Sequence, residues 1–110
     1  MTYIEHIQQG VKQLYPELSS EQVVAWFEWI ITQPDYYITT IGNATCVTKV
    51  YNQSDPPWLR VAHEVAWWGK GRDAVRVLHR GMDWARLKGA SHYGYSIAPR
   101  LDVVKWRSLL

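Results

Sequence analysis

Apolar residues recur with a helical period over the first third of the chain. Between residues 4 and 14 they return every three or four positions, which predicts a first helix that ends before Pro16. Ser19 or Ser20 suits the start of a second helix, because a short hydroxyl side chain can accept a hydrogen bond from the free N–H groups of the first turn. The apolar face of this second helix continues to Pro34.

The pattern changes at Tyr36 to the β-branched and aromatic residues that are typical of strands. Two strands, at 36–41 and 44–51, flank the dipeptide Gly42-Asn43, which favours a tight hairpin turn. The composition of residues 52–57 is that of a loop.

A third strand is predicted at 59–68. Because successive side chains of a strand point to opposite faces, strict alternation puts Glu64 and Trp68 on one face and Trp67 on the other. Gly69-Lys70-Gly71 then interrupts the strand.

Asp73 can cap or open a helix that follows this break and ends at Gly89. The remainder of the chain is predicted to form three short elements, namely a strand at 91–97, a turn at Ala98-Pro99 and a helix at 101–110.

The predicted element order is therefore α-α-β-β-β-α-β-α. Strands joined by hairpins pair antiparallel, whereas the third and fourth strands, joined through a helix, should be parallel. The expected fold class is α/β (α+β), a mixed and mainly antiparallel sheet with helices on both faces. At 110 residues we expect one domain, spanning 1–110.

The composition favours an ordered and soluble chain. It is 47% hydrophobic, with seven Trp, seven Tyr and a single Phe. No run approaches the ~18 apolar residues of a membrane span, and the first residues lack a signal peptide, so we expect a cytoplasmic protein without a membrane partner. The lone Cys46 excludes an internal disulfide and a cysteine-based zinc site, and we expect no metal.

The charge is divided unevenly along the chain. Residues 1–58 carry two bases and six acids, a net charge of −4, whereas residues 59–110 carry ten bases and four acids, a net charge of +6. Arg72, Arg76 and Arg80 form a stripe on the predicted central helix, which is either a solvated face or a surface for phosphates. We rank nucleic acid as a minor alternative, because a pI of 8.8 is only moderate.

The break between the third strand and the central helix is a candidate anion site. Glycines there let backbone N–H groups approach a phosphate at the positive end of the helix dipole, and Lys70 and Arg72 add charge. The glycine spacing matches neither a P-loop nor the three-glycine dinucleotide motif, so an ordinary strand-to-helix turn is the alternative.

The stretch from His63 to Ala90 resembles the acetyl-CoA-binding core of the GNAT superfamily of N-acetyltransferases. The resemblance includes the glycine-bearing turn at 69–71 and the run from Leu78 through Met82 and Trp84 to Gly89-Ala90. It covers roughly residues 20–110, with the specific match at 61–97. The predicted order lacks the first and last strands of that fold, so the chain is short for it and is similar to short GNAT-like proteins of phages.

The resemblance implies an acetyl-CoA cosubstrate and an amine-bearing small molecule or protein as acceptor. It implies Glu64 as the general base. The implied acetyl-CoA contacts are the end of the third strand, for the pantetheine arm beside residues 93–96, and the following loop, for the pyrophosphate: Ala66, Trp67, Trp68, Gly69, Lys70, Gly71, Arg72, Asp73 and Ala74.

Two alternatives stay open from the sequence. Glu64 can instead pair with a neighbouring base such as Arg60, which would make it structural. The whole chain can also be a GNAT-like module without catalysis that binds or assembles, including as a homo-oligomer through an open sheet edge or exposed Trp side chains.

Overall fold

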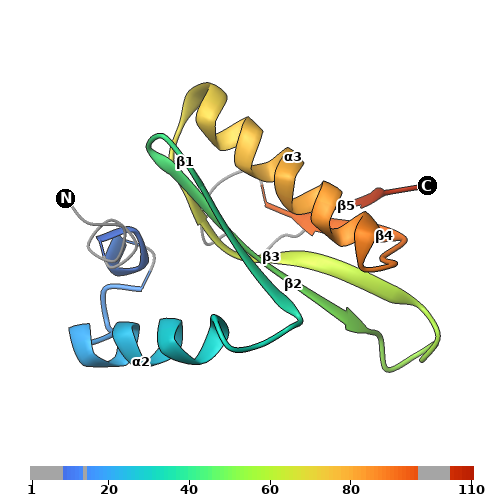
Figure 1. Cartoon of the computed structure of the whole chain (residues 1–110), viewed down its shortest axis with the longest axis horizontal. Coiled ribbons are helices and arrows are strands. Elements are labelled where there is room, and N and C mark those ends of the chain that lie inside the picture. The colour runs from blue at the N-terminus through green and yellow to red at the C-terminus, as the bar shows by residue number, and fades with distance from the viewer. Residues whose placement is uncertain (1–8, 14, 97–104) are drawn as a thin grey trace.

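The fold is a mixed sheet with helices packed on its two faces (Figure 1). The computed structural model describes residues 9–13, 15–96 and 105–110. Residues 9–13 are helical. The other elements are α2 (Ser20–Ile30), β1 (Tyr36–Ile41), β2 (Ala44–Asn52), β3 (Arg60–Trp68), α3 (Gly71–Leu87), β4 (His92–Tyr95) and β5 (Lys105–Ser108).

The sheet has the strand order β1-β2-β3-β4-β5. β1 pairs with β2, β2 with β3, and β4 with β5 in antiparallel fashion, while β3 and β4 are parallel. The predicted hairpin turns at Gly42, whose φ of 56° lies in the left-handed region that glycine tolerates. The predictions of an antiparallel first half and a parallel crossover through α3 are therefore confirmed.

The start of α2 confirms the predicted cap. Ser19 is the N-cap, and its hydroxyl accepts a hydrogen bond from the backbone N–H of Gln22 at 3.1 Å. The Gln22 side chain accepts one in return from the backbone N–H of Ser19 at 2.8 Å. This reciprocal pair satisfies two N–H groups that would otherwise lack partners, which fixes where the helix begins.

The predicted C-terminal helix is wrong where the structure describes it. Residues 105–108 form β5, an edge strand that pairs with β4 from Tyr95↔Lys105 to His92↔Ser108. A segment this short has no periodicity that separates helix from strand, and pairing with β4 decides its state. The predicted turn at Ala98-Pro99 and the helix residues 101–104 lie outside the described residues, as do residues 1–8 and 14 of the first predicted helix.

β3 carries a β-bulge at Val65, which overturns the predicted alternation. Val47 of β2 pairs with Ala66 while the next residue, Thr48, pairs with Glu64, so Val65 is an extra residue. An extra residue shifts every later side chain to the opposite face. Glu64 and Trp67 consequently lie on the α3 face, and Trp68 lies on the other.

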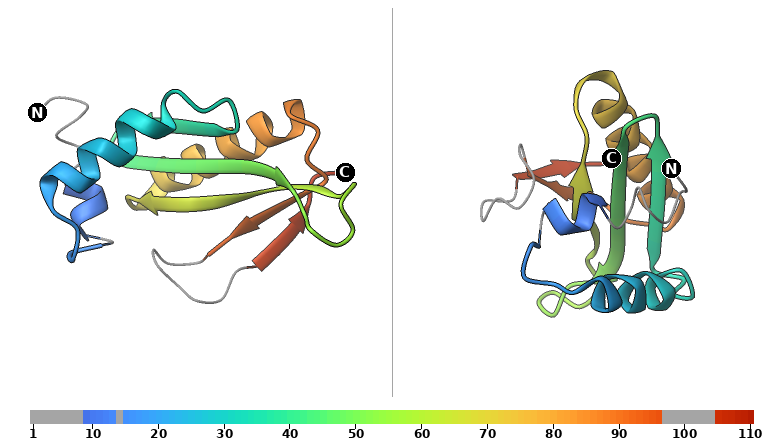
Figure 2. Two further views of the ribbon diagram at one scale, coloured as in Figure 1. Left: turned by 90° about the horizontal axis from the view of Figure 1, so that it is seen from below. Right: turned by 90° about the vertical axis from the view of Figure 1, so that its left-hand side faces the viewer.

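Helices lie on both faces of the sheet (Figure 2), and each face has its own core of buried side chains. On one face α3 packs on β2, β3 and β4, where Gly81 approaches the hydroxyls of Tyr93 and Thr48 so closely that a Cβ would clash. On the other face helical residues 9–13 and α2 pack on Ala66 and Trp68. A Cβ on Gly10 would overlap the Trp68 indole ring, so this glycine permits the close contact.

Candidate functional site

β3 and β4 separate part of the way along their length. They pair only from Val61↔His92 to His63↔Gly94, and the end of β3 then continues without β4 beside it in the described residues. A pocket of about 280 Å³ lies between this separation and α3. Its lining includes Glu64 and Trp67 of β3 and Ser96 just after β4. The bulge and the separation thus bring a carboxyl group into an otherwise apolar pocket.

Glu64 lies at the point where the two strands part. The backbone N–H of Ser96 donates a hydrogen bond to its carboxyl group, while its Oε2 atom is buried and has no hydrogen-bond partner among the described residues. Burial raises the pKa of Glu64 to about 8, and the hydrogen bond from Ser96 opposes only part of that rise. A carboxyl group with this pKa exchanges a proton near neutral pH.

The alternative that Arg60 neutralises Glu64 is wrong. The Arg60 guanidinium donates to Asn52 Oδ1 at 3.0 Å and to the carbonyl oxygen of Lys88 at 2.8 Å, and it lies 3.8 Å from the Asp35 carboxylate. Arg60 therefore ties β3 to the end of α3 and to the segment before β1. Glu64 is left without a basic partner among the described residues.

Trp67 borders the same pocket and joins the separated strands. Its indole Nε1–H donates to Ser96 Oγ at 3.2 Å. Ser96 therefore holds two side chains of β3, Glu64 through its backbone and Trp67 through its hydroxyl. The resemblance implied that residues 93–96 flank this gap, but nothing in the sequence indicated that Ser96 contacts both Glu64 and Trp67.

Behind Glu64 lies a buried group of polar side chains that sequence reasoning missed. The Thr48 hydroxyl lies 3.1 Å from the Tyr93 hydroxyl and 3.5 Å from Cys46 Sγ. Burial raises the pKa of the Cys46 thiol to about 12, with a further rise from the nearby Glu64. The thiol therefore stays protonated and is not a nucleophile. The available signal was that Cys46 and Thr48, two residues apart on one strand, share a face.

The loop between β3 and α3 contains most of the predicted acetyl-CoA contacts. Lys70 is the N-cap of α3 and makes no side-chain cap hydrogen bond, and Gly71, with a φ of 66°, has open space where a Cβ would stand. Of the two roles predicted for Asp73, the cap is wrong, since the N-cap is Lys70, whereas the position of Asp73 in the first turn agrees with a residue that opens the helix. Its carboxylate accepts a hydrogen bond from the backbone N–H of Asn43 at 3.4 Å.

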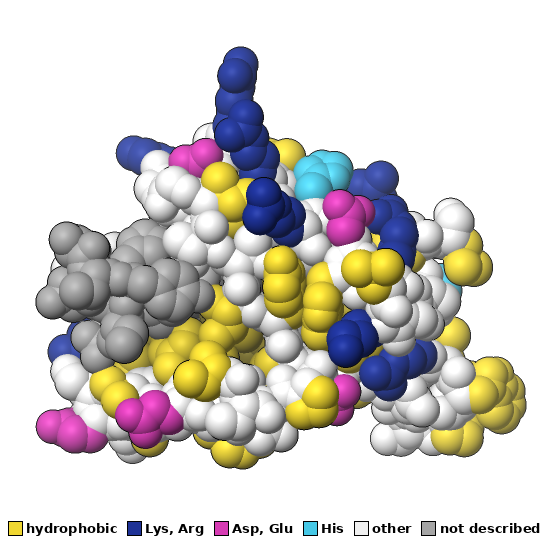
Figure 3. Space-filling model, in the orientation of Figure 1, with side chains coloured by type: hydrophobic (Ala, Val, Ile, Leu, Met, Phe, Trp, Pro, Cys, Tyr) yellow, Lys and Arg dark blue, Asp and Glu magenta, His cyan; other side chains and the backbone are white. Residues whose placement is uncertain are grey.

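Basic side chains gather over α3 in Figure 3. Arg72, Arg76 and Arg80 are all exposed, and none of the three forms an ion pair or hydrogen bond with another described residue. By contrast, Arg86 near the end of the helix pairs with Asp83 at 2.9 Å. The beginning of α3 therefore carries uncompensated positive charge beside the open backbone at Gly71.

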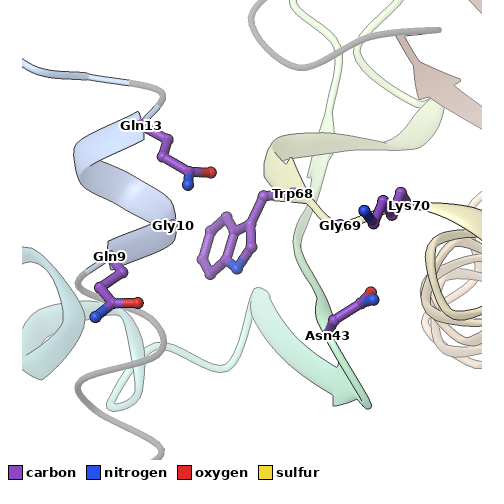
Figure 4. A pocket seen from close by; sticks show the side chains of 7 residues that line it. All are labelled: Gln9, Gly10, Gln13, Asn43, Trp68, Gly69 and Lys70. Carbon is purple, nitrogen blue, oxygen red and sulfur yellow. The ribbon is translucent and has the colours of Figure 1, made fainter. Parts of the chain in front are cut away.

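A second pocket, of about 350 Å³, lies on the other side of the end of β3 (Figure 4). It is formed by Gln9, Gly10 and Gln13 of the first helical segment, by Asn43 of the hairpin turn, and by Trp68, Gly69 and Lys70. Most of its polar side chains are exposed.

The predicted site residues are consequently divided between two sides of β3. Glu64, Trp67 and Ala74 line the pocket beneath α3, while Trp68, Gly69 and Lys70 line the second pocket. Ala66 is buried in the core beneath α2, and Gly71 and Arg72 are exposed at the start of α3.

The His, Cys, Asp and Glu side chains of the described residues include no group of three or more that is arranged to hold a metal ion. No helix in the described part of the chain combines the length and the apolar character that crossing a bilayer requires.

Comparison of the chain with protein-family models, with curated proteins and with solved structures found no match.

Proposed function

We propose that this protein is a small N-acetyltransferase that binds acetyl-CoA between β3 and β4 and transfers the acetyl group to a primary amine. The observation that carries the proposal is the separation of the two strands directly beside Glu64, a buried carboxyl group with a pKa of about 8. A general base is most effective when its pKa is near the working pH. Glu64 meets that condition, and an ordinary surface glutamate does not.

The backbone around the separation has the groups that acetyl-CoA would need. The edge of β3 at 66–68 has no strand beside it on the β4 side in the described residues, so its N–H and C=O groups are available to the amides of a pantetheine arm. The N–H groups in the first turn of α3, which has no side-chain cap, and the cations Lys70 and Arg72 suit a pyrophosphate, and the open space beside Gly71 leaves room for it. Asp73, whose charge would repel it, is engaged with the hairpin turn.

In the proposed reaction Glu64 removes a proton from the acceptor nitrogen. The nitrogen lone pair then forms a C–N bond to the acetyl carbon while the C–S bond to coenzyme A breaks. The second proton of the nitrogen passes through water to the departing thiolate, so that the products are the amide and the thiol of coenzyme A, and Glu64 returns its proton to solvent. The Trp67 hydrogen bond to Ser96 crosses the separation. We expect this bond to open when acetyl-CoA binds.

Isothermal titration with acetyl-CoA tests the proposal. The double variant Lys70→Gln/Arg72→Gln should bind about tenfold more weakly, because it loses two charge-assisted contacts to phosphate. The variant Arg76→Gln/Arg80→Gln is the matched control, since it removes the same charge from the same helix one to two turns farther on. Glu64→Gln should keep the wild-type affinity and lose acetyl transfer.

Absence of binding at millimolar acetyl-CoA would overturn the proposal. The second candidate would then be a non-catalytic binding or assembly module. This is favoured by the exposure of three indole side chains, Trp29 at 50%, Trp58 at 81% and Trp106 at 47%. Analytical sedimentation separates the two functions further, since an assembly module sediments as an oligomer or a complex.

A further inference from the structure

The pocket beneath α3 combines one carboxyl group with apolar walls. Glu64 is the only acidic or basic residue among the described residues that line it. The walls come from β2, β3, α3 and β4: Cys46, Trp67, Ala74, Val77, Leu78 and Tyr95. Glu64 thus brings to the wall of the pocket a buried carboxyl oxygen, Oε2, that has no hydrogen-bond partner among the described residues.

We infer that this pocket binds a small primary amine with a single positive charge and an apolar body, with the amine nitrogen against the Glu64 carboxyl group. The inference rests on the proposed function, because it names the class of acceptor for that site. An ammonium group supplies the hydrogen-bond donor and the charge that Glu64 Oε2 lacks. The walls contributed by Val77 and Leu78 suit an alkyl or aryl body and offer neither an ion pair nor a hydrogen bond to a second charged group.

The volume of the pocket limits which amines it can hold. A volume of 280 Å³ is that of about nine liquid water molecules. An arylalkyl amine such as 2-phenylethylamine has about that bulk, whereas a folded protein surface or an aminoglycoside exceeds it. Val75 lies at the rim of the pocket and is 54% exposed, so the pocket reaches the surface beside α3.

Amine binding at this site is coupled to the release of one proton. Near pH 7 the free amine is protonated, and so is the buried Glu64, because burial raises its pKa to about 8. The free ammonium group and the protonated Glu64 carboxyl group each carry one acidic proton. The ammonium–carboxylate pair of the complex keeps only one of the two, so amine binding releases one proton to solvent. The affinity should therefore rise by about tenfold per pH unit below pH 8.

The other groups that face Glu64 do not compete with this titration. Cys46 on β2 has a pKa raised to about 12, and the pKa of Tyr93 on β4 is raised well above its ordinary value, both chiefly by burial. The described α3 residues of the lining, Ala74, Val75, Val77 and Leu78, carry no charge, and Tyr95 is a phenol on the β4 side of the pocket. The pH dependence of amine binding thus reports Glu64.

Calorimetric titration of the whole chain with 2-phenylethylamine, without acetyl-CoA, tests the inference. The matched probes are 2-phenylethanol, which lacks the charge, and spermidine, which carries additional charges. At pH 8 the amine should bind at least about tenfold more tightly than the alcohol, and its affinity should fall at least about tenfold on lowering the pH to 6. Spermidine should bind more weakly than 2-phenylethylamine.

Two variants locate the binding. Glu64→Gln, which keeps the side-chain shape, should bind the amine no more tightly than the alcohol and lose the pH dependence. Glu28→Gln, which removes an exposed carboxylate on α2, should behave as wild type. Circular dichroism checks that both variants are folded, and the three probes on the wild-type protein test the inference without any variant.

Equal affinity for amine and alcohol at pH 8 would overturn the inference, and so would tighter binding of spermidine. These outcomes are distinct from failure of the proposed function. If the amine binds as expected and acetyl-CoA does not, the amine site is supported and the proposed transferase function is wrong. If acetyl-CoA binds and the amine does not, the transferase takes its acceptor elsewhere and this inference is wrong.

Discussion

Trp67 and Trp68 are adjacent in the chain but serve opposite sides of β3. Trp68 is only 5% exposed and lies under Gly10 of the first helical segment, on a side where helix and sheet are in close contact. Trp67 is half-buried and borders a pocket of about 280 Å³ that is also lined by Glu64, whose Oε2 atom has no hydrogen-bond partner among the described residues. The comparison teaches that one end of a strand can build a packed core on one face and leave a pocket with a buried carboxyl group on the other.

Truncation of the two indole side chains should give the largest difference in the free energy of unfolding between the two sides of β3. Trp68→Ala should lower the free energy of unfolding by about 3–5 kcal/mol, because it empties a closely packed site. Trp67→Ala should cost about 1–2 kcal/mol, since this side chain is half-buried and makes one hydrogen bond to Ser96. Urea denaturation followed by circular dichroism measures both. Equal losses would mean that the pocket side is as tightly packed as the other.

The stability of the pocket side should also depend on pH, because Glu64 titrates there. The pKa of Glu64 rises from 4.5 to about 8 on folding, so between these values the folded chain holds a proton that the unfolded chain has released. Wild-type stability should therefore fall as the pH rises from about 5 to 8, by up to about 1.4 kcal/mol per pH unit, and this contribution is constant below pH 4.5.

Glu64→Gln removes the titration and serves as the reference. Relative to wild type, its free energy of unfolding should improve by roughly 2–4 kcal/mol between about pH 5 and pH 8.5. Denaturation curves of both proteins at several pH values measure this difference. A constant difference across that range would show that Glu64 keeps an ordinary pKa, and it would remove the reason for regarding the carboxyl group as a base.

The smallest effect concerns the polar group behind the pocket. Tyr93→Phe should cost about 1 kcal/mol, because it leaves the buried Thr48 hydroxyl without the phenol 3.1 Å away. Tyr95→Phe, on the same strand and without such a contact, is the control and should change stability by less than about 0.5 kcal/mol. Equal effects of the two substitutions would show that the Thr48 contact does not stabilise the fold.

The fold was predictable where local chemistry decides it. The cap at Ser19, the turn at Gly42-Asn43 and the parallel crossover through α3 all follow from side-chain and connection rules, and the structure has each of them. The segment 105–108 was not predictable, because Lys-Trp-Arg-Ser has no decisive periodicity and becomes β5 by pairing with β4. Its state depends on a distant partner, which a local pattern does not contain.

The site was predictable only in part, for a related reason. The resemblance to the GNAT superfamily singled out Glu64, but the surroundings of this side chain depend on the bulge at Val65, and no residue type there signals a bulge. Arg60 was the expected partner because it is near in sequence, yet it contacts Asn52 and Lys88. Ser96, Thr48 and Tyr93 join the site through pairings across the sheet.

The bulge at Val65 changes which side chains of β3 face α3. Before Val65 the even-numbered residues of β3 face α3, and after it the odd-numbered ones do. Deletion of Val65 would leave a regular strand in which Glu64 and Trp67 still share the α3 face. The same residues in a strand without the bulge would instead place Trp68 beside Glu64 and Trp67 beneath the helical residues 9–13. Which indole borders the pocket therefore depends on how β3 pairs with β2 as much as on the identity of the residues.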